Sequence, residues 1–322
     1  MSYKLIHSAL FGVAIGDALG VPVEFRNREY LKSNPVTDML AYGTHNQPAG
    51  TWSDDSSLTF CLADMLSNGY NLKKLSDNFI SWYRGDLWTP YGEVFDIGNA
   101  TASAINRLRQ GVNPLMAGGA DESDNGNGSL MRILPLAFYV KSMPVEQRFS
   151  CVSEVSSLTH RHIRSVLGCF IYIEFALRLM KGADKFDAFH QTKEMVNDFL
   201  NHNPICSERE INIYHRILMN PVDGSGIKPI YEYAESDIAS SGYVLHSLEA
   251  AIWCLLNENS FENTVLRAVN LGSDTDTTAA IAGGLAGLLY GFDAIPQKWI
   301  NQLARKNDIF DLCDKLEKKL RE

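Results

Sequence analysis

The chain has 322 residues, of which 45% are hydrophobic and 21% charged, so it can bury the core of an ordinary globular protein. A net charge of −9 and a pI of about 5.4 argue against nonspecific nucleic-acid or anionic-membrane binding, because both need a basic face. We therefore expect no stable nucleic-acid partner and no membrane association. No close pair of cysteines and no signal-peptide pattern is evident, which favours the cytoplasm.

Helical periodicity dominates the chain, and clean alternation is scarce. The best candidate for a strand is 227–233, and long loops are expected at 24–52, 111–127 and 201–208. No linker-like segment and no repeat divides the sequence, so we expect one all-α domain over 1–322. In chain order, the predicted helices are 58–66, 166–180, 188–200, 242–256, 261–269 and 309–320.

Two segments carry glycines four residues apart, which places a glycine stripe on one face of a helix. The first contains Gly12, Gly16 and Gly20, and the second contains Gly283, Gly287 and Gly291. Each glycine lowers helix propensity by about 1 kcal/mol relative to alanine, so a repeated stripe indicates close backbone approach. We expect two central helices that pack near each other.

Two acidic segments lie at opposite ends of the chain, Ser53-Asp54-Asp55-Ser56-Ser57 and Ser273-Asp274-Thr275-Asp276-Thr277-Thr278. Four carboxylates in one place would repel each other and partly protonate, and divalent cations would remove that conflict. Hard oxygen ligands suit Mg²⁺, Ca²⁺ or Mn²⁺ rather than zinc. Helix N-capping is the alternative, but capping needs only one acid or hydroxyl at each helix.

Three weaker motifs lie between these segments. Asn125-Gly126-Asn127-Gly128-Ser129 is either an ordinary turn or a nest whose backbone N–H groups bind an anion. Arg132 follows it and could pair with a carboxylate or phosphate. His160 could donate to a phosphate or ribose, or could be a packed side chain. Asp96 is flanked by apolar residues, a setting that can raise the pKa of a carboxyl group but also suits a structural aspartate.

The ordered set of motifs resembles the ADP-ribosylglycohydrolases, in particular the bacterial dinitrogenase-reductase-activating glycohydrolase branch. The resemblance spans nearly the whole chain, and each motif is modest while their order is specific. The motifs that carry it are Gly12 to Phe25, Ser53-Asp54-Asp55, Asp96-Ile97-Gly98-Asn99, Gly126-Asn127-Gly128 through Met131-Arg132, Leu158-Thr159-His160, Ser241-Gly242-Tyr243, and Gly272 to Thr278.

The resemblance implies a single-domain orthogonal helical bundle with two Mg²⁺ ions, or Mn²⁺ in some members. Carried onto matching positions, the metal ligands would be Ser53, Asp54, Asp55, Asp274, Asp276 and Thr277. Asp96 would match the acid/base group, with Glu24 beside the metals. The substrate-binding positions would be Asn99, Asp124, Asn125, Gly126, Gly128, His160 and Tyr243. Many relatives have threonine where this chain has Ser53, and its hydroxyl or carbonyl oxygen can still bind a metal.

The implied reaction hydrolyses the bond between ADP-ribose and a protein side chain, with arginine expected from the bacterial branch. Serine-linked and nucleic-acid-linked ADP-ribose stay open as substrates, as does a toxin-immunity role. A non-catalytic ADP-ribose-binding or structural protein on the same scaffold is the alternative. A phosphohydrolase of the histidine-aspartate-motif class is disfavoured, because the sequence contains no adjacent His-Asp pair. We expect a monomer that binds an ADP-ribosylated protein as its substrate and also binds ADP-ribose.

Overall fold

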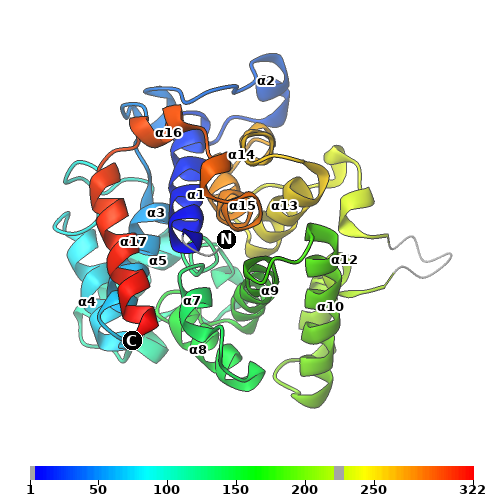
Figure 1. The fold of residues 1–322 in the computed structure, drawn as a ribbon. Helices are drawn as coiled ribbons and strands as arrows, with labels where there is room; N and C mark the ends of the chain where they lie inside the picture. The colour runs from blue at the N-terminus through cyan, green and yellow to red at the C-terminus, as the bar shows by residue number, and fades with distance from the viewer. Residues whose placement is uncertain (1–3, 221–227) are drawn as a thin grey trace.

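The computed structural model describes residues 4–220 and 228–322 (Figure 1). Within these residues the chain forms 17 α-helices and no β-strand, so the all-α prediction is confirmed. The first nine are α1 (Leu5–Gly20), α2 (Arg28–Ser33), α3 (Asp54–Ser67), α4 (Leu72–Tyr83), α5 (Asn99–Arg109), α6 (Pro114–Ala117), α7 (Leu136–Val140), α8 (Val145–Ser157) and α9 (Ile163–Met180). They are followed by α10 (Lys185–His202), α11 (Glu208–Ile213), α12 (His215–Leu218), α13 (Val244–Asn257), α14 (Phe261–Asn270), α15 (Thr275–Tyr290), α16 (Gln297–Gln302) and α17 (Lys306–Arg321).

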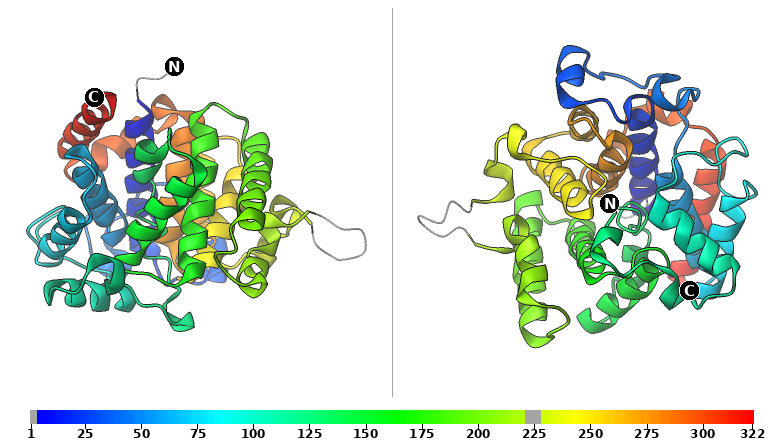
Figure 2. Two further views of the ribbon diagram at one scale, coloured as in Figure 1. Left: turned by 90° about the horizontal axis from the view of Figure 1, so that it is seen from below. Right: turned by 180° about the vertical axis from the view of Figure 1, so that it is seen from behind.

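Helices α1 and α15 lie side by side at the centre of the bundle (Figures 1 and 2). They run in opposite directions, and their backbones touch along the glycine stripes. A Cβ atom on Gly12 would lie 2.2 Å from the carbonyl oxygen of Gly283, and one on Gly16 would lie 2.0 Å from that of Ala279. The expected central helix pair is confirmed, except that Gly291 lies just beyond the end of α15.

The predicted helices all occur, and most extend a few residues beyond the periodic pattern. Several of their N-termini begin at polar caps that the hydrophobic pattern does not mark. Ser260, for example, accepts a hydrogen bond from the backbone N–H of Asn263 at the start of α14. The expected loop at 24–52 contains α2, and the loop at 111–127 contains α6.

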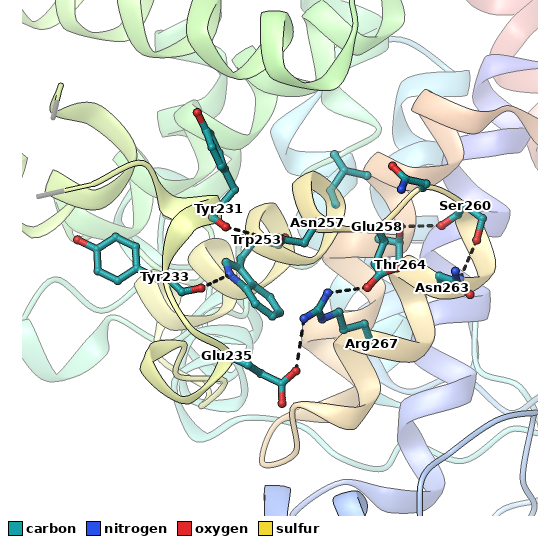
Figure 3. Close-up of polar contacts among 12 residues, drawn as sticks. Tyr231, Tyr233, Glu235, Trp253, Asn257, Glu258, Ser260, Asn263, Thr264 and Arg267 are labelled. Atoms are coloured by element: carbon teal, nitrogen blue, oxygen red, sulfur yellow. Dashed lines mark hydrogen bonds and ion pairs between the residues drawn. The ribbon is translucent and has the colours of Figure 1, made fainter.

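The strand expected at 227–233 is wrong for the residues that the structure describes, and Ile227 lies outside them. Ile230–Glu232 form one 3₁₀ turn instead. Two backbone carbonyls of this segment accept hydrogen bonds from side chains of α13 rather than from a neighbouring strand (Figure 3). Trp253 Nε1 donates to the carbonyl of Tyr233 at 3.0 Å, and Asn257 Nδ2 donates to that of Tyr231 at 3.3 Å. The alternating aromatic residues therefore reflect packing on a helix.

One segment of the described residues, Leu5–Val23, is long and apolar enough to cross a membrane by length and composition. Its whole apolar window is buried inside the bundle, where it packs against α15. Length and hydropathy alone are thus weak evidence for a membrane span here. Asp17 interrupts the apolar run of this segment.

Candidate metal and substrate site

The first acidic segment is held in place by a carboxylate from α1. Asp17 accepts hydrogen bonds from the backbone N–H of Ser53, at 2.9 and 3.1 Å, and from the N–H of Ser56, at 3.0 Å. The hydroxyl of Ser56 donates to the same carboxylate at 2.5 Å. Asp17 therefore caps α3 and leaves the side chains of Asp54 and Asp55 available for another role.

The second acidic segment meets the first at the N-terminus of α15. Thr275 Oγ1 donates to the carbonyl of Gly20 at 2.8 Å, which joins α15 to the end of α1. Thr277 Oγ1 donates to Asp55 Oδ2 at 3.3 Å, and Ser53 Oγ donates to the same oxygen at 2.9 Å. Segments more than 200 residues apart thus converge on one carboxylate.

Five acidic side chains form two groups that share Asp276. In one group, carboxylate oxygens of Asp17, Asp55 and Asp276 all lie within 4.8 Å of one another. In the other, those of Glu24, Asp274 and Asp276 do so. Because Asp276 belongs to both groups, the cluster could hold two neighbouring cations that share this carboxylate.

Burial dominates the electrostatics of this cluster. It raises the pKa of Asp54, Asp55 and Asp276 well above the ordinary value, and the neighbouring carboxylates raise these pKa values further. Three buried oxygens, Asp55 Oδ1, Asp274 Oδ1 and Asp276 Oδ2, have no hydrogen-bond partner. Buried acceptors without a partner are costly, and these hard oxygens fit a divalent cation of the Mg²⁺ type.

A cavity of about 380 Å³ opens beside the cluster. Its lining includes the acidic residues Glu24, Asp54, Asp96 and Asp274. Asp96 adopts a left-handed backbone conformation, with φ of 54°, that few residues other than glycine adopt, and such strain is often found at functional sites. Among the other lining residues are Asn99, Gly126, Gly128, His160 and Thr277.

His160 and the glycine turn also line this cavity. A Cβ on Gly128 would lie 2.7 Å from His160 Cε1, so this glycine is required for close approach to the imidazole. His160 Nδ1 lies 2.8 Å from Thr159 Oγ1, and burial lowers the pKa of the ring to about 3. A neutral imidazole in this position can exchange hydrogen bonds with a sugar or phosphate without adding charge.

The remaining expected substrate-binding residues lie around two adjoining cavities. Asn125 and Tyr243 line one of about 260 Å³, which Gly126 and Gly242 join to the central cavity. Asp124 lines the other, of about 390 Å³, rather than the central one. The side chain of Asp124 also accepts a hydrogen bond from the N–H of Asp121, at 3.0 Å, within a capping box.

Asn127 and Arg132 hold this site together. Asn127 Nδ2 donates to Asp274 Oδ2 and to Ser247 Oγ, both at 2.8 Å. Arg132 is fully buried, donates to the carbonyl of Gly128, and donates to that of Val155 at 3.0 Å. Arg132 thus braces the glycine turn through backbone carbonyls.

Two residues of the site were not singled out from the sequence. Asp17 lies inside the glycine-rich segment between Gly12 and Gly20, and it is the one acidic residue there. An acid in an apolar helix was the sequence feature that could have identified it. His45 Nε2 hydrogen-bonds Glu24 Oε2 and lies 3.9 Å from Asp96 Oδ1, so it connects the two carboxyl groups. It is the sole histidine between Glu24 and Trp52, which is too weak a signal to identify it.

A tight turn brings His45 to this position. Gly43 has φ of 70°, and a Cβ atom there would lie 1.9 Å from the carbonyl oxygen of Pro22. The turn therefore needs glycine both for its conformation and for space. Thr44 Oγ1 then donates to the carbonyl of Glu24 at 2.7 Å, which fixes the loop over the cavity.

Comparison with known proteins identifies the fold and the family of this chain. The chain matches the family model described as ADP-ribosylglycohydrolase over residues 3–322. It is 34% identical to the ADP-ribosylarginine hydrolase Tri1 of Pseudomonas putida (strain GB-1), over 96% of this chain and 76% of that protein. Its identity to Tri1 of Serratia proteamaculans (strain 568) is 31%, over 96% and 77%. The ADP-ribosyl-[dinitrogen reductase] glycohydrolase of Rhodospirillum rubrum is 24% identical, over 92% and 90%.

A solved structure, described as an ADP-ribosylglycohydrolase-related protein complex, superposes with a TM-score of 0.79 at 28% identity and covers 98% of both chains. The fold is therefore an all-α helical bundle of the glycohydrolase type, as expected. The chain belongs to the ADP-ribosylglycohydrolase family and is a glycohydrolase.

Proposed function

We propose that this protein removes ADP-ribose from modified arginine side chains of proteins in a reaction that depends on a pair of divalent cations. The two Tri1 relatives, which are ADP-ribosylarginine hydrolases, support the choice of arginine. The observation that carries the metal dependence is the buried carboxylate cluster, in which three oxygens have no protein partner. Its opening into a polar cavity gives a substrate access to that cluster.

The proposed metal ligands are Ser53, Asp54, Asp55, Asp274, Asp276 and Thr277, with Asp17 positioned at the same cluster. Two Mg²⁺ or Mn²⁺ ions bound there would supply positive charge that orients the ribose hydroxyls and the attacking water. The protein holds these groups in advance, because both segments begin helices that are anchored to α1.

Proton transfer falls to Glu24 and Asp96. Glycosidic hydrolysis needs one group to protonate the leaving atom and one to accept a proton from water. Burial, followed by the charges of Asp96 and Asp274, raises the pKa of Glu24 to about 10 in the metal-free site. His45 Nε2, hydrogen-bonded to Glu24 Oε2, fixes the orientation of that carboxyl.

The part of the cavity near the glycine turn would bind the ADP-ribose itself. Gly126, Gly128 and His160 would contact the diphosphate and ribose, with Asn99 nearby. Tyr243 is half-buried beside Gly126 and offers an aromatic face to the base. Asp124 lies one cavity further on, and we assign it to the loop that shapes this end.

The test is release of ADP-ribose from arginine-, serine- and nucleic-acid-linked substrates, each with Mg²⁺, Mn²⁺ or EDTA. We expect the fastest release from arginine with a metal and none with EDTA. Asp55→Asn should lose most activity while keeping its fold, as judged by circular dichroism. Faster release from serine or nucleic acid would refute the arginine assignment, and full activity in EDTA would refute the metal assignment.

We also propose that 1–322 works as a single-domain cytoplasmic monomer without a nucleic-acid or membrane partner. The net charge of −9 supports the last two points. Analytical ultracentrifugation of the purified chain would test the oligomeric state, and cell fractionation would test the location.

A further inference from the structure

Phe25 is a large, exposed apolar side chain that lines the central cavity together with acidic residues. Its side chain and backbone together are 68% exposed, and it lines the central cavity beside Glu24, Asp54 and Asp96. Its backbone has φ of 65°, in the left-handed region. A bulky residue in that region costs roughly 1 kcal/mol or more and persists only where the surroundings enforce it.

The surroundings of Phe25 do enforce this conformation. Its backbone N–H donates to the carbonyl of Ser273 at 2.7 Å, and the N–H of Ser273 donates back to the carbonyl of Arg26 at 2.7 Å. Ser273 is the first residue of the second acidic segment. The backbone of Phe25 and Arg26 is therefore tied to the second acidic segment by two hydrogen bonds.

The ring also contacts the residue that orients Glu24. The centroids of the Phe25 and His45 rings are 5.9 Å apart, with an interplanar angle of 58°. His45 in turn hydrogen-bonds Glu24 and lies 3.9 Å from Asp96. One wall of the cavity thus combines an aromatic surface with two carboxyl groups.

This combination suits a planar cation. A guanidinium group stacks on aromatic faces and donates forked hydrogen bonds to carboxylates, whereas a serine hydroxyl does neither. Gly126, Gly128 and the neutral His160 also line the cavity, and they suit the polar and anionic ADP-ribose. A substrate whose ADP-ribose contacts these three residues would then place its leaving group at Phe25.

We propose that Phe25 is a specificity-determining residue that stacks on the guanidinium of the modified arginine while Glu24 and Asp96 face its N–H groups. This inference rests on the proposed function and extends it to a residue that the sequence motifs did not assign. It implies that Phe25 contributes to recognition of the arginine and contributes nothing to binding of free ADP-ribose.

The experiment compares wild type with Phe25→Leu, which keeps an apolar side chain but removes the aromatic face. The expected result on an ADP-ribosylarginine peptide is a rise in KM of about 3- to 30-fold, the range of one cation–π contact. The Kd for ADP-ribose, measured by calorimetry with Mg²⁺, should stay unchanged. Phe25→Tyr should restore a KM close to that of wild type.

Phe186→Leu is the matched control, because Phe186 is also exposed, at 37%, and lies on α10 away from the cavity. It should leave the KM for the arginine peptide unchanged. An unchanged KM in Phe25→Leu would overturn the inference, as would an equal loss of ADP-ribose affinity. A wild-type enzyme that releases nothing from the arginine peptide would refute the proposed function itself, so the two failures are distinguishable.

Discussion

The substitution Asp276→Asn should distinguish two effects of the carboxylate cluster on stability. One is the loss of stability caused by crowded buried carboxylates, and the other is the gain from bound metal. Asp276 is fully buried, belongs to both acidic groups, and has one oxygen, Oδ2, without a partner. Burial and then the charges of Glu24 and Asp55 raise its pKa well above the ordinary value. The uncharged amide would end this repulsion and could donate to a neighbouring carboxylate, so the metal-free variant should be more stable than metal-free wild type.

Metal binding should act in the opposite direction. A ligand at 100 times its Kd stabilises the native state by about 2.7 kcal/mol. For a chain of 322 residues, an unfolding entropy of about 2.1 cal/mol/K per residue means that about 0.7 kcal/mol shifts Tm by about 1 °C. Each Mg²⁺ site should therefore raise the Tm of wild type by about 4 °C at that concentration. Asp276→Asn should lose most of this shift, because it removes a charge from both groups.

The assay is calorimetric Tm in EDTA and in increasing MgCl₂. Asp198→Asn is the control, since the Asp198 side chain is 76% exposed on α10, and it should match wild type in both conditions. We expect Asp276→Asn to melt above wild type in EDTA and below it at saturating Mg²⁺. A lower Tm in EDTA would show that the carboxylate is a structural requirement. A wild-type Mg²⁺ shift in the variant would show that Asp276 binds no metal.

Three further predictions concern the helix pair, the chemistry and the pH dependence. Gly16→Ala should lower the urea-unfolding free energy by about 1–3 kcal/mol, because its Cβ would meet the carbonyl oxygen of Ala279 at 2.0 Å. Gly284→Ala should cost less, because its Cβ would meet movable side-chain atoms; equal losses would contradict this reasoning. Asp96→Asn should keep the Mg²⁺-induced rise in Tm but slow single-turnover release of ADP-ribose, and unchanged turnover would exclude Asp96 from proton transfer. Burial raises the pKa of Asp17 from 3.8 to about 6, so the proton that it binds in the folded state contributes stability below pH 4 that is lost as the pH rises to 6. The unfolding free energy of the metal-free protein should therefore fall by about 3 kcal/mol through this group over that interval, and Asp17→Asn should flatten the curve.

Sequence periodicity predicted the helices well where an apolar face continues for several turns, as in α9 and α13. It also predicted that α1 and α15 touch, because glycines repeated at four-residue spacing serve close approach in a helix. The alternating aromatic residues at 231 and 233 misled because period-two patterns also arise where a turn packs on a helix. Trp253 and Asn257 supply the hydrogen bonds that a neighbouring strand would have supplied.

For the site, oxygen-rich segments were recognisable because more acids and hydroxyls are present than helix caps need. The structure brings these segments together around Asp55 and Asp276, and the ligand roles stay a prediction. His45 could not be identified from the sequence, because its position depends on tertiary contacts. These are the packing of the turn at Gly43 against Pro22 and the hydrogen bond between His45 and Glu24. Asp17 was hidden by its helical, glycine-rich surroundings.

The contact between α1 and α15 can form only late in the synthesis of the chain. Leu5 to Gly20 leave the ribosome early, whereas Thr275 to Tyr290 emerge when most of the nascent chain is already synthesised. Until then the apolar α1 lacks the surface that covers its glycine face, and such exposed segments favour aggregation and chaperone binding. Catalytic competence would thus arise late and abruptly during translation, and truncated products would carry no partial activity.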